Sequence, residues 1–414
     1  MQDKDTTKTT FFQLFQPVFQ GVISQFIKTT GVDKYVKKLT TIKLFQLLFF
    51  AQVEQYSGLR DISNSLNHKD HSLCMKLESI SHSQISRRLN AIPTSVFQVL
   101  FQDLVHQAGI KMGFEKIRNN LGRIYLIDSS TISLCLSRFR WAEFRKTKGG
   151  VKLHLRLRFF EQGVLPDHAE ITAAKPSDKS QMDNLVVDEK DAINIFDRGY
   201  IDYKKFDDYC EKGIRFITRL KANALVTIQQ ELQVEPESAI KQDCIVILGG
   251  PQKRMKYPVR LIATTDTEGN PVTIVTNDFD MSTEEIGELY RYRWQIEIFF
   301  KWIKQNLFVK HMYGFSKQAV QNQLYIALAT YCLLMIIKLI SGYNGPFLTI
   351  KRFLRVCLYE PVEEFFRKLG YKSKRTSKGR CRLNHEKVFQ QTLHQVMEGE
   401  TDFLDDLTYD PMIL

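Results

Sequence analysis

Two aspartates directly follow apolar runs of the kind that form buried β-strands. Asp128 ends the run RIYLID and Asp197 ends the run AINIFD, and the turn-forming residues SST and RGY come next. In α/β sheets, side chains at the carboxyl ends of strands point into the crevice where ligands bind. A strand-end aspartate often only caps a turn, so a third element is needed to predict a site.

The segment from Tyr290 to Lys304 supplies that third element, because its charged residues recur at helical spacing. At about 100° per residue, four side chains project within about 60° of one another along about 21 Å of helix: Tyr290, Arg293, Glu297 and Lys304. Lys301 and Trp294 project beside them. The far side is apolar, with Ile296, Phe299, Phe300 and Ile303.

We therefore expect a helix that begins near Ser282 and runs past Trp302, with one packed face and one face that presents an acid among cations. The simpler interpretation is that Arg293 and Glu297 form an ordinary i,i+4 surface pair, worth a few tenths of a kcal/mol. That pair alone leaves the aromatic residue and the lysines on the same line unexplained.

Three carboxylates, from Asp128, Asp197 and Glu297, suggest chemistry on phosphodiesters. Cleavage and strand transfer at such bonds use two divalent ions about 4 Å apart, and Mg²⁺ prefers oxygen ligands. The sequence contains no H-E-x-x-H, P-loop, G-x-G-x-x-G or G-x-S-x-G motif. Zinc-protease, nucleotide-hydrolase and serine-hydrolase chemistry are therefore not supported.

The same segments resemble DDE transposases of the insertion-sequence-four family. The resemblance rests on IDSST at Asp128, on DRGYIDYKKF from Asp197, on FITRLK and on YRYRWQIEIFFKWIK. The last segment matches that family's Y-x2-R-x3-E-x6-K signature, and the similar region covers roughly residues 120–340.

The resemblance implies a ribonuclease-H-like mixed sheet with a β-rich insertion. It implies that Asp128, Asp197 and Glu297 are catalytic and bind two Mg²⁺ ions, for which Mn²⁺ can substitute. The implied DNA-binding residues of this region are Tyr290, Arg293, Trp294, Lys301 and Lys304. Tyr290, Arg293 and Lys304 would hold phosphates of the transposon end, and Trp294 would pack behind them or stack on a base.

The predicted function is that of a cut-and-paste transposase of a bacterial insertion sequence. It would bind the double-stranded DNA of the terminal inverted repeats as a dimer and free a 3′-hydroxyl with water. That hydroxyl would then attack target DNA. Two alternatives stay open: a ribonuclease-H-like nuclease without strand transfer, and a non-catalytic DNA-binding protein derived from a transposase.

Residues 1–120 are expected to form an all-α N-terminal domain, because apolar residues recur there at helical spacing and no strand pattern interrupts them. This region also resembles the N-terminal domain of many such transposases, which implies that it binds the inverted repeats. Within it, SISHSQISRRLNAI predicts a short helix capped by Ser81 or Ser83, with Arg87 and Arg88 on its exposed side. This helix is interpreted as the groove-binding helix of a helix-turn-helix or as an ordinary surface helix.

Residues 121–345 are expected to form the α/β catalytic domain. Its elements follow the order strand, strand, strand, helix, strand, helix, strand, and further strands fill an insertion at about 221–277, with a turn at DTEGN. One face of a predicted strand carries every second residue, namely His154, Arg156 and Arg158. We expect this face to contact either DNA or solvent. Residues 324–340 are too short for a membrane span and contain Lys338, so they predict a buried helix.

The composition predicts a basic protein that binds a polyanionic partner. It also favours a cytoplasmic location with no membrane association. The 58 basic and 46 acidic residues give a net charge of +12, and the seven cysteines form no C-x-x-C pair. Residues 346–414 are expected to be a helical and basic region with an acidic tail. Its basic residues between 367 and 382 hold phosphates or lie in a solvated loop.

Overall fold

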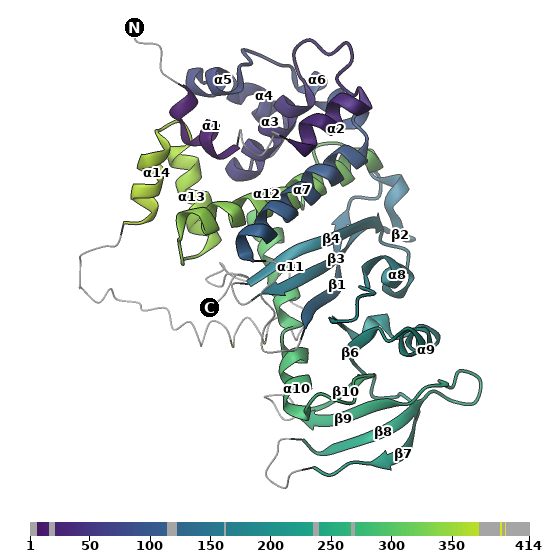
Figure 1. The fold of residues 1–414 in the computed structure, drawn as a ribbon. Helices are drawn as coiled ribbons and strands as arrows, with labels where there is room; N and C mark the ends of the chain where they lie inside the picture. Colours follow the sequence, from purple (N-terminus) through teal and green to yellow (C-terminus); the bar gives the residue numbers. More distant parts are fainter. Residues whose placement is uncertain are drawn as a thin grey trace. The chain divides into compact units, whose positions relative to one another are not determined.

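A computed structural model of the protein describes residues 6–15, 21–113, 122–160, 163–234, 240–265 and 270–371, together with Gln390 and His394. Contacts divide the chain into two compact units. The helical unit comprises Met1–Phe114, Ile132–Gly150 and Ile298–Leu414, and the sheet unit comprises Glu115–Thr131 and Val151–Glu297. Each is described by itself below, and Figure 1 shows their elements.

The helical unit joins both ends of the described chain. Its N-terminal helices are α1 (Thr10–Phe15), α2 (Val22–Thr30), α3 (Thr41–Glu54), α4 (Leu59–Ser65), α5 (Lys69–Met75), α6 (His82–Ala91) and α7 (Thr94–Met112). Its later helices include α12 (Lys317–Ser341), α13 (Phe347–Cys357) and α14 (Val362–Leu369). The backbone N–H groups of Thr10 and Phe11 donate to the carbonyls of Glu360 and Leu358, both at 2.8 Å, so the free donors at the start of α1 are satisfied by the segment before α14.

Helix α12 is the core of this unit. It packs mainly against α7 and α3. It is the one described helix that is long and apolar enough to cross a membrane, yet 83% of its most apolar window is buried inside the protein. The prediction of a buried core helix is confirmed.

Helix α6 begins as the sequence predicts. The hydroxyl of Ser81 accepts a hydrogen bond from the backbone N–H of Gln84, and the side-chain oxygen of Gln84 accepts one from the backbone N–H of Ser81, so the two residues form a capping box. Ile85 and Leu89 form its buried side, and Arg87 is exposed.

The sheet unit carries most of a ten-stranded mixed sheet in the order β2-β3-β1-β5-β6-β10-β9-β8-β7, with β4 paired to β3. The strands are β1 (Arg123–Leu134), β2 (Glu143–Arg145), β3 (Lys148–Phe160), β4 (Gly163–Ala173), β5 (Ala192–Phe196), β6 (Arg215–Arg219), β7 (Val226–Glu231), β8 (Gln242–Leu248), β9 (Val259–Thr265) and β10 (Pro271–Thr276). β1, β5 and β6 run parallel. Apart from the short β2, the predicted order of elements is confirmed.

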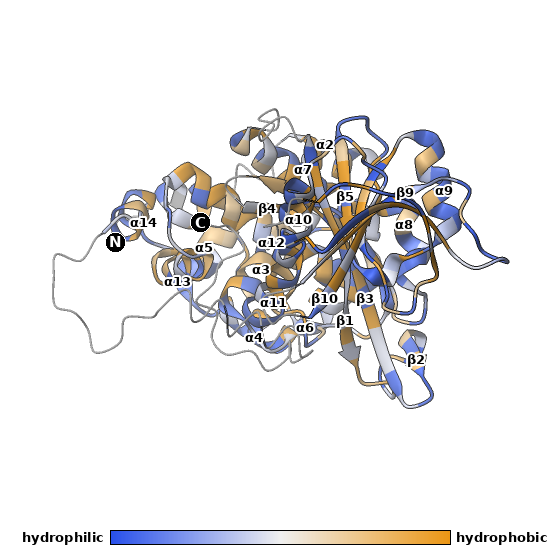
Figure 2. Cartoon of the chain, turned by 90° about the horizontal axis from the view of Figure 1, so that it is seen from below, coloured by the Kyte–Doolittle hydropathy of each residue, from blue (hydrophilic) through white to orange (hydrophobic). Residues whose placement is uncertain are grey.

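One face of this sheet is covered by α8 (Met182–Leu185) and α9 (Tyr203–Lys212), which can be followed in Figure 1. Leu185 and Phe206 from these helices share an apolar cluster with Phe216 of β6 and Val246 of β8. All five residues of β5 are buried, and Figure 2 colours this strand as hydrophobic. Four of the five are apolar, and the fifth, Asn194, hydrogen-bonds to the backbone of Val187. Buried, mainly apolar strands are typical of the parallel centre of a sheet.

The β-rich insertion continues the same sheet, because β10 pairs antiparallel with β6. The strands β7 to β10 follow one another as antiparallel neighbours. Of the turn expected at DTEGN, residues 266–269 lie outside the described residues.

Strand β1 does not end at Asp128 as predicted but continues to Leu134. Its pairing with β5 stops at Ile127, opposite Phe196. On its other side β1 has β3 as a neighbour, so its backbone continues as a strand after β5 has turned away.

The predicted long helix is in fact two helices, α10 (Thr283–Arg291) and α11 (Trp294–Asn306). Ser282 caps α10 in a capping box with Glu285, as expected. At the junction the backbone N–H of Arg293 donates to the carbonyl of Tyr290 at 3.1 Å, and that of Ile296 donates to Arg293 at 3.2 Å. These i→i+3 bonds advance the chain by about 120° per residue rather than about 100°, so the projection of one straight stripe is wrong.

Candidate active site

The sheet places Asp128 and Asp197 next to each other. Ile127 of β1 pairs in register with Phe196 of β5, and each aspartate is the following residue on its strand. Neighbouring strands lie about 4.8 Å apart, so the two backbones are adjacent where the parallel pairing ends. Asp197 then stands at the N-terminus of the short turn Arg198–Tyr200.

Arg293 connects the third acid to this edge. Its Nη1 is paired with Oε1 of Glu297 in the first turn of α11, and it lies 3.9 Å from Oδ2 of Asp128. The three side chains are 12%, 20% and 19% exposed. The pair is therefore largely desolvated, unlike the surface pair of the simpler interpretation.

The electrostatics show that the acids influence one another. Burial raises the pKa of Asp128 to about 8; Arg293 opposes this rise, and Glu297 and Asp197 add to it. Burial also raises the pKa of Glu297, against the effect of Arg293. A cluster of acids that face one another in a partly buried place is typical of a functional site.

The donor set suits a hard divalent cation, because all of its ligand atoms are carboxylate oxygens. The three acids carry more negative charge than Arg293 balances when they are ionised. Within the described ranges, no three acid, histidine or cysteine side chains are arranged closely enough to share a metal ion. In this arrangement Arg293 is the cation paired with Asp128 and Glu297.

Two aromatic rings flank this arginine. Its guanidinium carbon lies 5.8 Å from the centre of the Tyr290 ring and 5.5 Å from that of Trp294. Both distances are in the range of cation–π contacts. The structure thus brings Tyr290, Arg293 and Trp294 to the acids.

Lys301 and Lys304 lie farther along α11, in the helical unit. Lys301 is only 3% exposed, so its expected place on an open face is wrong, and Lys304 is partly buried. The physical reason is that this part of α11 is packed around most of its circumference, including Phe299 and Trp302.

The two arginines of α6 differ in their surroundings. Arg88 donates to Oδ1 of Asp33 at 2.6 Å, to the carbonyl of Leu39 at 3.1 Å and to the hydroxyl of Thr41 at 3.1 Å. It therefore ties α6 to the start of α3. Arg87 is exposed, and DNA binding by either residue stays a prediction.

Asp178, which no sequence pattern singles out, lies next to the candidate site. Its Oδ1 accepts a hydrogen bond from the hydroxyl of Ser129, the residue after Asp128, at 2.5 Å. His154, expected to face DNA or solvent, is fully buried and lies beside Asp178, because its strand face is covered. The one local signal was the position of Ser129 directly after a candidate acid.

The terminal charge runs fall mostly outside the described residues. Of the basic run, Arg367 and Lys368 are described, and they pair with Glu364 and Glu360. Residues 372–382 and the acidic tail are not described.

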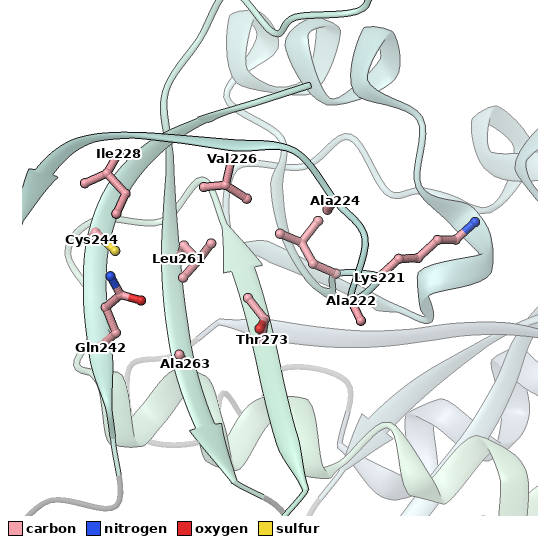
Figure 3. A pocket seen from close by; sticks show the side chains of 11 residues that line it. Lys221, Ala222, Ala224, Val226, Ile228, Gln242, Cys244, Leu261, Ala263 and Thr273 are labelled. Atoms are coloured by element: carbon pink, nitrogen blue, oxygen red, sulfur yellow. The ribbon is translucent and has the colours of Figure 1, made fainter. Parts of the chain in front are cut away.

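A separate hollow of about 250 Å³ lies on the insertion, and Figure 3 shows its lining. Its lining combines apolar side chains, among them Val226, Ile228 and Leu261, with the polar Lys221 and Gln242. None of the three acids lines it.

Comparison with known families gives two matches. Residues 119–333 match the model described as "Transposase DDE domain". Residues 6–75 match one described as "Domain of unknown function (DUF4372)". The first match contains all three candidate acids.

Similar proteins carry transposase names. The "Probable transposase for insertion sequence element IS5377" of Geobacillus stearothermophilus is 25% identical over 333 residues, which cover 79% of this chain and 84% of that protein. The "Putative transposase y4zB" of Sinorhizobium fredii is 28% identical over 276 residues, 65% of this chain and 74% of that one. Among solved structures, a piggyBac transposase synaptic complex with hairpin DNA matches with a TM-score of 0.47 and 9% identity, over 90% of this chain and 84% of that chain.

Proposed function

Since the chain belongs to the transposase DDE domain family, whose model matches residues 119–333 of its 414, we propose that it is the cut-and-paste transposase of a bacterial insertion sequence. The signature Y-x2-R-x3-E-x6-K favours the insertion-sequence-four type. The observation that carries the proposal is the meeting of Asp128 and Asp197 at the end of one parallel strand pair, with Glu297 linked to Asp128 through Arg293.

The fold we propose for the catalytic region is ribonuclease-H-like. Its support is the mixed sheet with parallel β1, β5 and β6 at its centre, and the strands inserted between the second aspartate and the glutamate. The sheet holds the two aspartates rigidly, and the start of α11 holds the glutamate.

We assign Asp128, Asp197 and Glu297 as the ligands of two Mg²⁺ ions, for which Mn²⁺ can substitute. When bound, such a pair of ions activates an attacking oxygen and stabilises the leaving oxygen. In the first reaction, water attacks a phosphodiester at each transposon end and leaves a 3′-hydroxyl. In the second reaction, this hydroxyl attacks a phosphodiester of the target DNA, forms a new bond and displaces the target's 3′ oxygen.

The residues around the acids are assigned to the DNA. Tyr290, Arg293 and Lys304 are assigned to phosphates of the transposon end, with Trp294 beside Arg293. The buried Lys301 is left out of this assignment. In the N-terminal helices, Arg87 has the exposure that phosphate binding needs, and Arg88 supports its helix from behind. Because the two ends are cut together, the active complex is a dimer on double-stranded DNA.

A cleavage assay tests the proposal. The protein is incubated with Mg²⁺ and labelled DNA that ends in the inverted repeat flanking its own gene. We expect a cut at the repeat that leaves a 3′-hydroxyl, and no cut with Glu297→Gln. The matched control is Glu284→Gln, which removes an exposed acid from the first turn of α10 and should cut normally.

Uncut DNA under conditions where the wild-type protein binds it would refute the proposal, and so would normal cutting by Glu297→Gln. Product analysis separates the alternatives. A transposase joins the 3′ end covalently to a second DNA molecule, a nuclease only cuts, and a DNA-binding derivative does neither.

A further inference from the structure

We propose that Asp178 is a positioning residue for both catalytic aspartates, acting through Ser129 on one side and beside Gly199 on the other. The inference rests on the proposed function, because it assigns a task at the same site. Asp178 begins a short 3-10 turn, Asp178–Gln181, that precedes α8. It lies in the sheet unit together with Asp128 and Asp197.

The first contact runs through Ser129. The hydroxyl of Ser129 donates to Oδ1 of Asp178 at 2.5 Å, and its backbone N–H donates to Oδ1 of Asp128 at 2.7 Å. One residue thus holds two carboxylates. If the hydroxyl is fixed by Asp178, the N–H that orients Asp128 is fixed with it.

The second contact is with the turn that carries Asp197. A Cβ atom placed on Gly199 would lie 3.9 Å from Oδ2 of Asp178 and 4.0 Å from Oδ2 of Asp197. Oδ2 of Asp178 and Oδ2 of Asp197 therefore both lie near Gly199, in the turn that follows β5. The other oxygen of Asp178, Oδ1, accepts from Ser129.

The charge of Asp178 is compensated from β3. Lys152 Nζ lies 3.0 Å from Oδ1 of Asp178, and the two side chains are 12% and 28% exposed. Oδ1 of Asp178 is thus engaged by both the hydroxyl of Ser129 and this ammonium. We therefore assign Asp178 a role in positioning and none as a metal ligand.

His154 is the fourth member of this cluster. It lies two residues after Lys152 on β3, on the same face of the strand. The hydroxyl of Thr172 donates to the carbonyl of Ala173, so it accepts from the Nε2–H of His154, 3.0 Å away. Nδ1 of His154 then carries a lone pair, is buried without a hydrogen-bond partner in the described part of the chain, and lies 3.7 Å from Oδ1 of Asp178. A buried polar atom without a partner is uncommon in native proteins and costs free energy.

Residues that orient metal ligands typically contribute 10- to 100-fold to metal affinity or activity. The test compares Asp178→Ala, Ser129→Ala and Ser129→Thr. Ser129→Ala removes only the hydroxyl and keeps the backbone N–H, and Ser129→Thr restores a hydroxyl. The matched control is Asp183→Ala, which removes an acid of α8 that pairs with Lys205 and is 74% exposed.

The first readout is Mn²⁺ affinity. It is measured by electron paramagnetic resonance on the full-length protein bound to a pre-cut repeat end. We expect about 10-fold weaker Mn²⁺ binding in Asp178→Ala and Ser129→Ala. We expect recovery in Ser129→Thr and no change in Asp183→Ala. DNA affinity, measured by fluorescence anisotropy, should stay the same in all four variants.

The second readout is the rate of strand cleavage, which should fall by about the same factor as the Mn²⁺ affinity. Mn²⁺ affinity equal to that of Asp183→Ala in both Asp178→Ala and Ser129→Ala would overturn the inference, and so would a Ser129→Thr variant as weak as Ser129→Ala. If Asp178→Ala fails to fold, the two serine variants decide the question. If wild-type protein binds Mn²⁺ but does not cut DNA, the proposed function fails while the positioning role is still measured by affinity.

Discussion

His71 should lower the stability of the helical unit at acidic pH. The variant His71→Phe should therefore be less stable than the wild type at neutral pH and more stable than the wild type at acidic pH. The side chain of His71 is 1% exposed on α5 and its ring lies 4.0 Å from that of Phe50. Nδ1 is 2.6 Å from the hydroxyl of Tyr359, and Nε2 is buried without a hydrogen-bond partner among the described residues. Burial, with a smaller effect of His68, lowers the pKa of His71 from 6.5 to about 3.

The sign follows from proton uptake. Between pH 6.5 and about 3 the unfolded chain binds a proton at His71 and the native protein does not, so stability falls as the pH is lowered through this window. At pH 4.5 the loss is about 3 kcal/mol, because each pKa unit corresponds to about 1.4 kcal/mol. The loss is absent above pH 6.5.

His71→Phe keeps the packing against Phe50 and gives up the hydrogen bond to Tyr359, worth about 1 kcal/mol. The variant should therefore be about 1 kcal/mol less stable than the wild type at pH 7.5. It should be about 1–2 kcal/mol more stable at pH 4.5, with the curves crossing near about pH 6. Urea unfolding followed by far-ultraviolet circular dichroism measures both values.

His82→Phe is the control, because it removes an exposed imidazole at the start of α6 and should give no crossing. If His71→Phe stayed less stable than the wild type at every pH from 4.5 to 7.5, the burial argument would be refuted. The burial argument would also be refuted if the stability curve of His82→Phe crossed that of the wild type as the curve of His71→Phe does.

Two further predictions concern the arginines. Arg293→Gln should lower the melting temperature of the metal-free protein, because Asp128 and Glu297 lose their cation. Millimolar Mn²⁺ should then raise the melting temperature of this variant more than that of the wild type. Equal Mn²⁺ shifts of the two proteins in a thermal denaturation assay would contradict this. Arg88→Ala should destabilise the protein by about 2–3 kcal/mol through its lost internal hydrogen bonds, whereas Arg87→Ala should leave the melting temperature unchanged and weaken DNA binding. The reverse pattern in thermal denaturation and anisotropy would show that the two roles are exchanged.

The parts of the fold that depend on local patterns could be predicted from the sequence. The apolar run before each aspartate produced a buried strand, and the capping residues Ser81 and Ser282 marked the starts of α6 and α10. The expected end of β1 was wrong because a strand continues wherever a second neighbour is present, and that neighbour, β3, is distant in sequence. Turn-like residues at 129–131 carry no information about it.

The surroundings of the acids could not be predicted for a similar reason. Asp178 contacts Ser129 across 49 positions and Lys152 across 26, and neither spacing corresponds to a helical or strand period. Lys301 was expected to be exposed because the helical projection shows only which residues share a face. What covers that face is determined by tertiary packing, which buries Lys301 to 3% exposure.

The junction between α10 and α11 explains how the acids can stand close together in the folded chain. Burial raises the pKa of Asp128 to about 8 and also raises that of Glu297, so ionising both acids there is costly. Arg293 lowers both pKa values, and it stands in the 3-10 turn where the backbone tightens between the two helices. In a straight exposed helix the same pair with Glu297 would be worth a few tenths of a kcal/mol. With Asp128 3.9 Å away and little solvent, the arginine instead balances two acids, so the spacing between Arg293 and Glu297 stabilises the folded site, apart from the phosphate contact that we propose for Arg293.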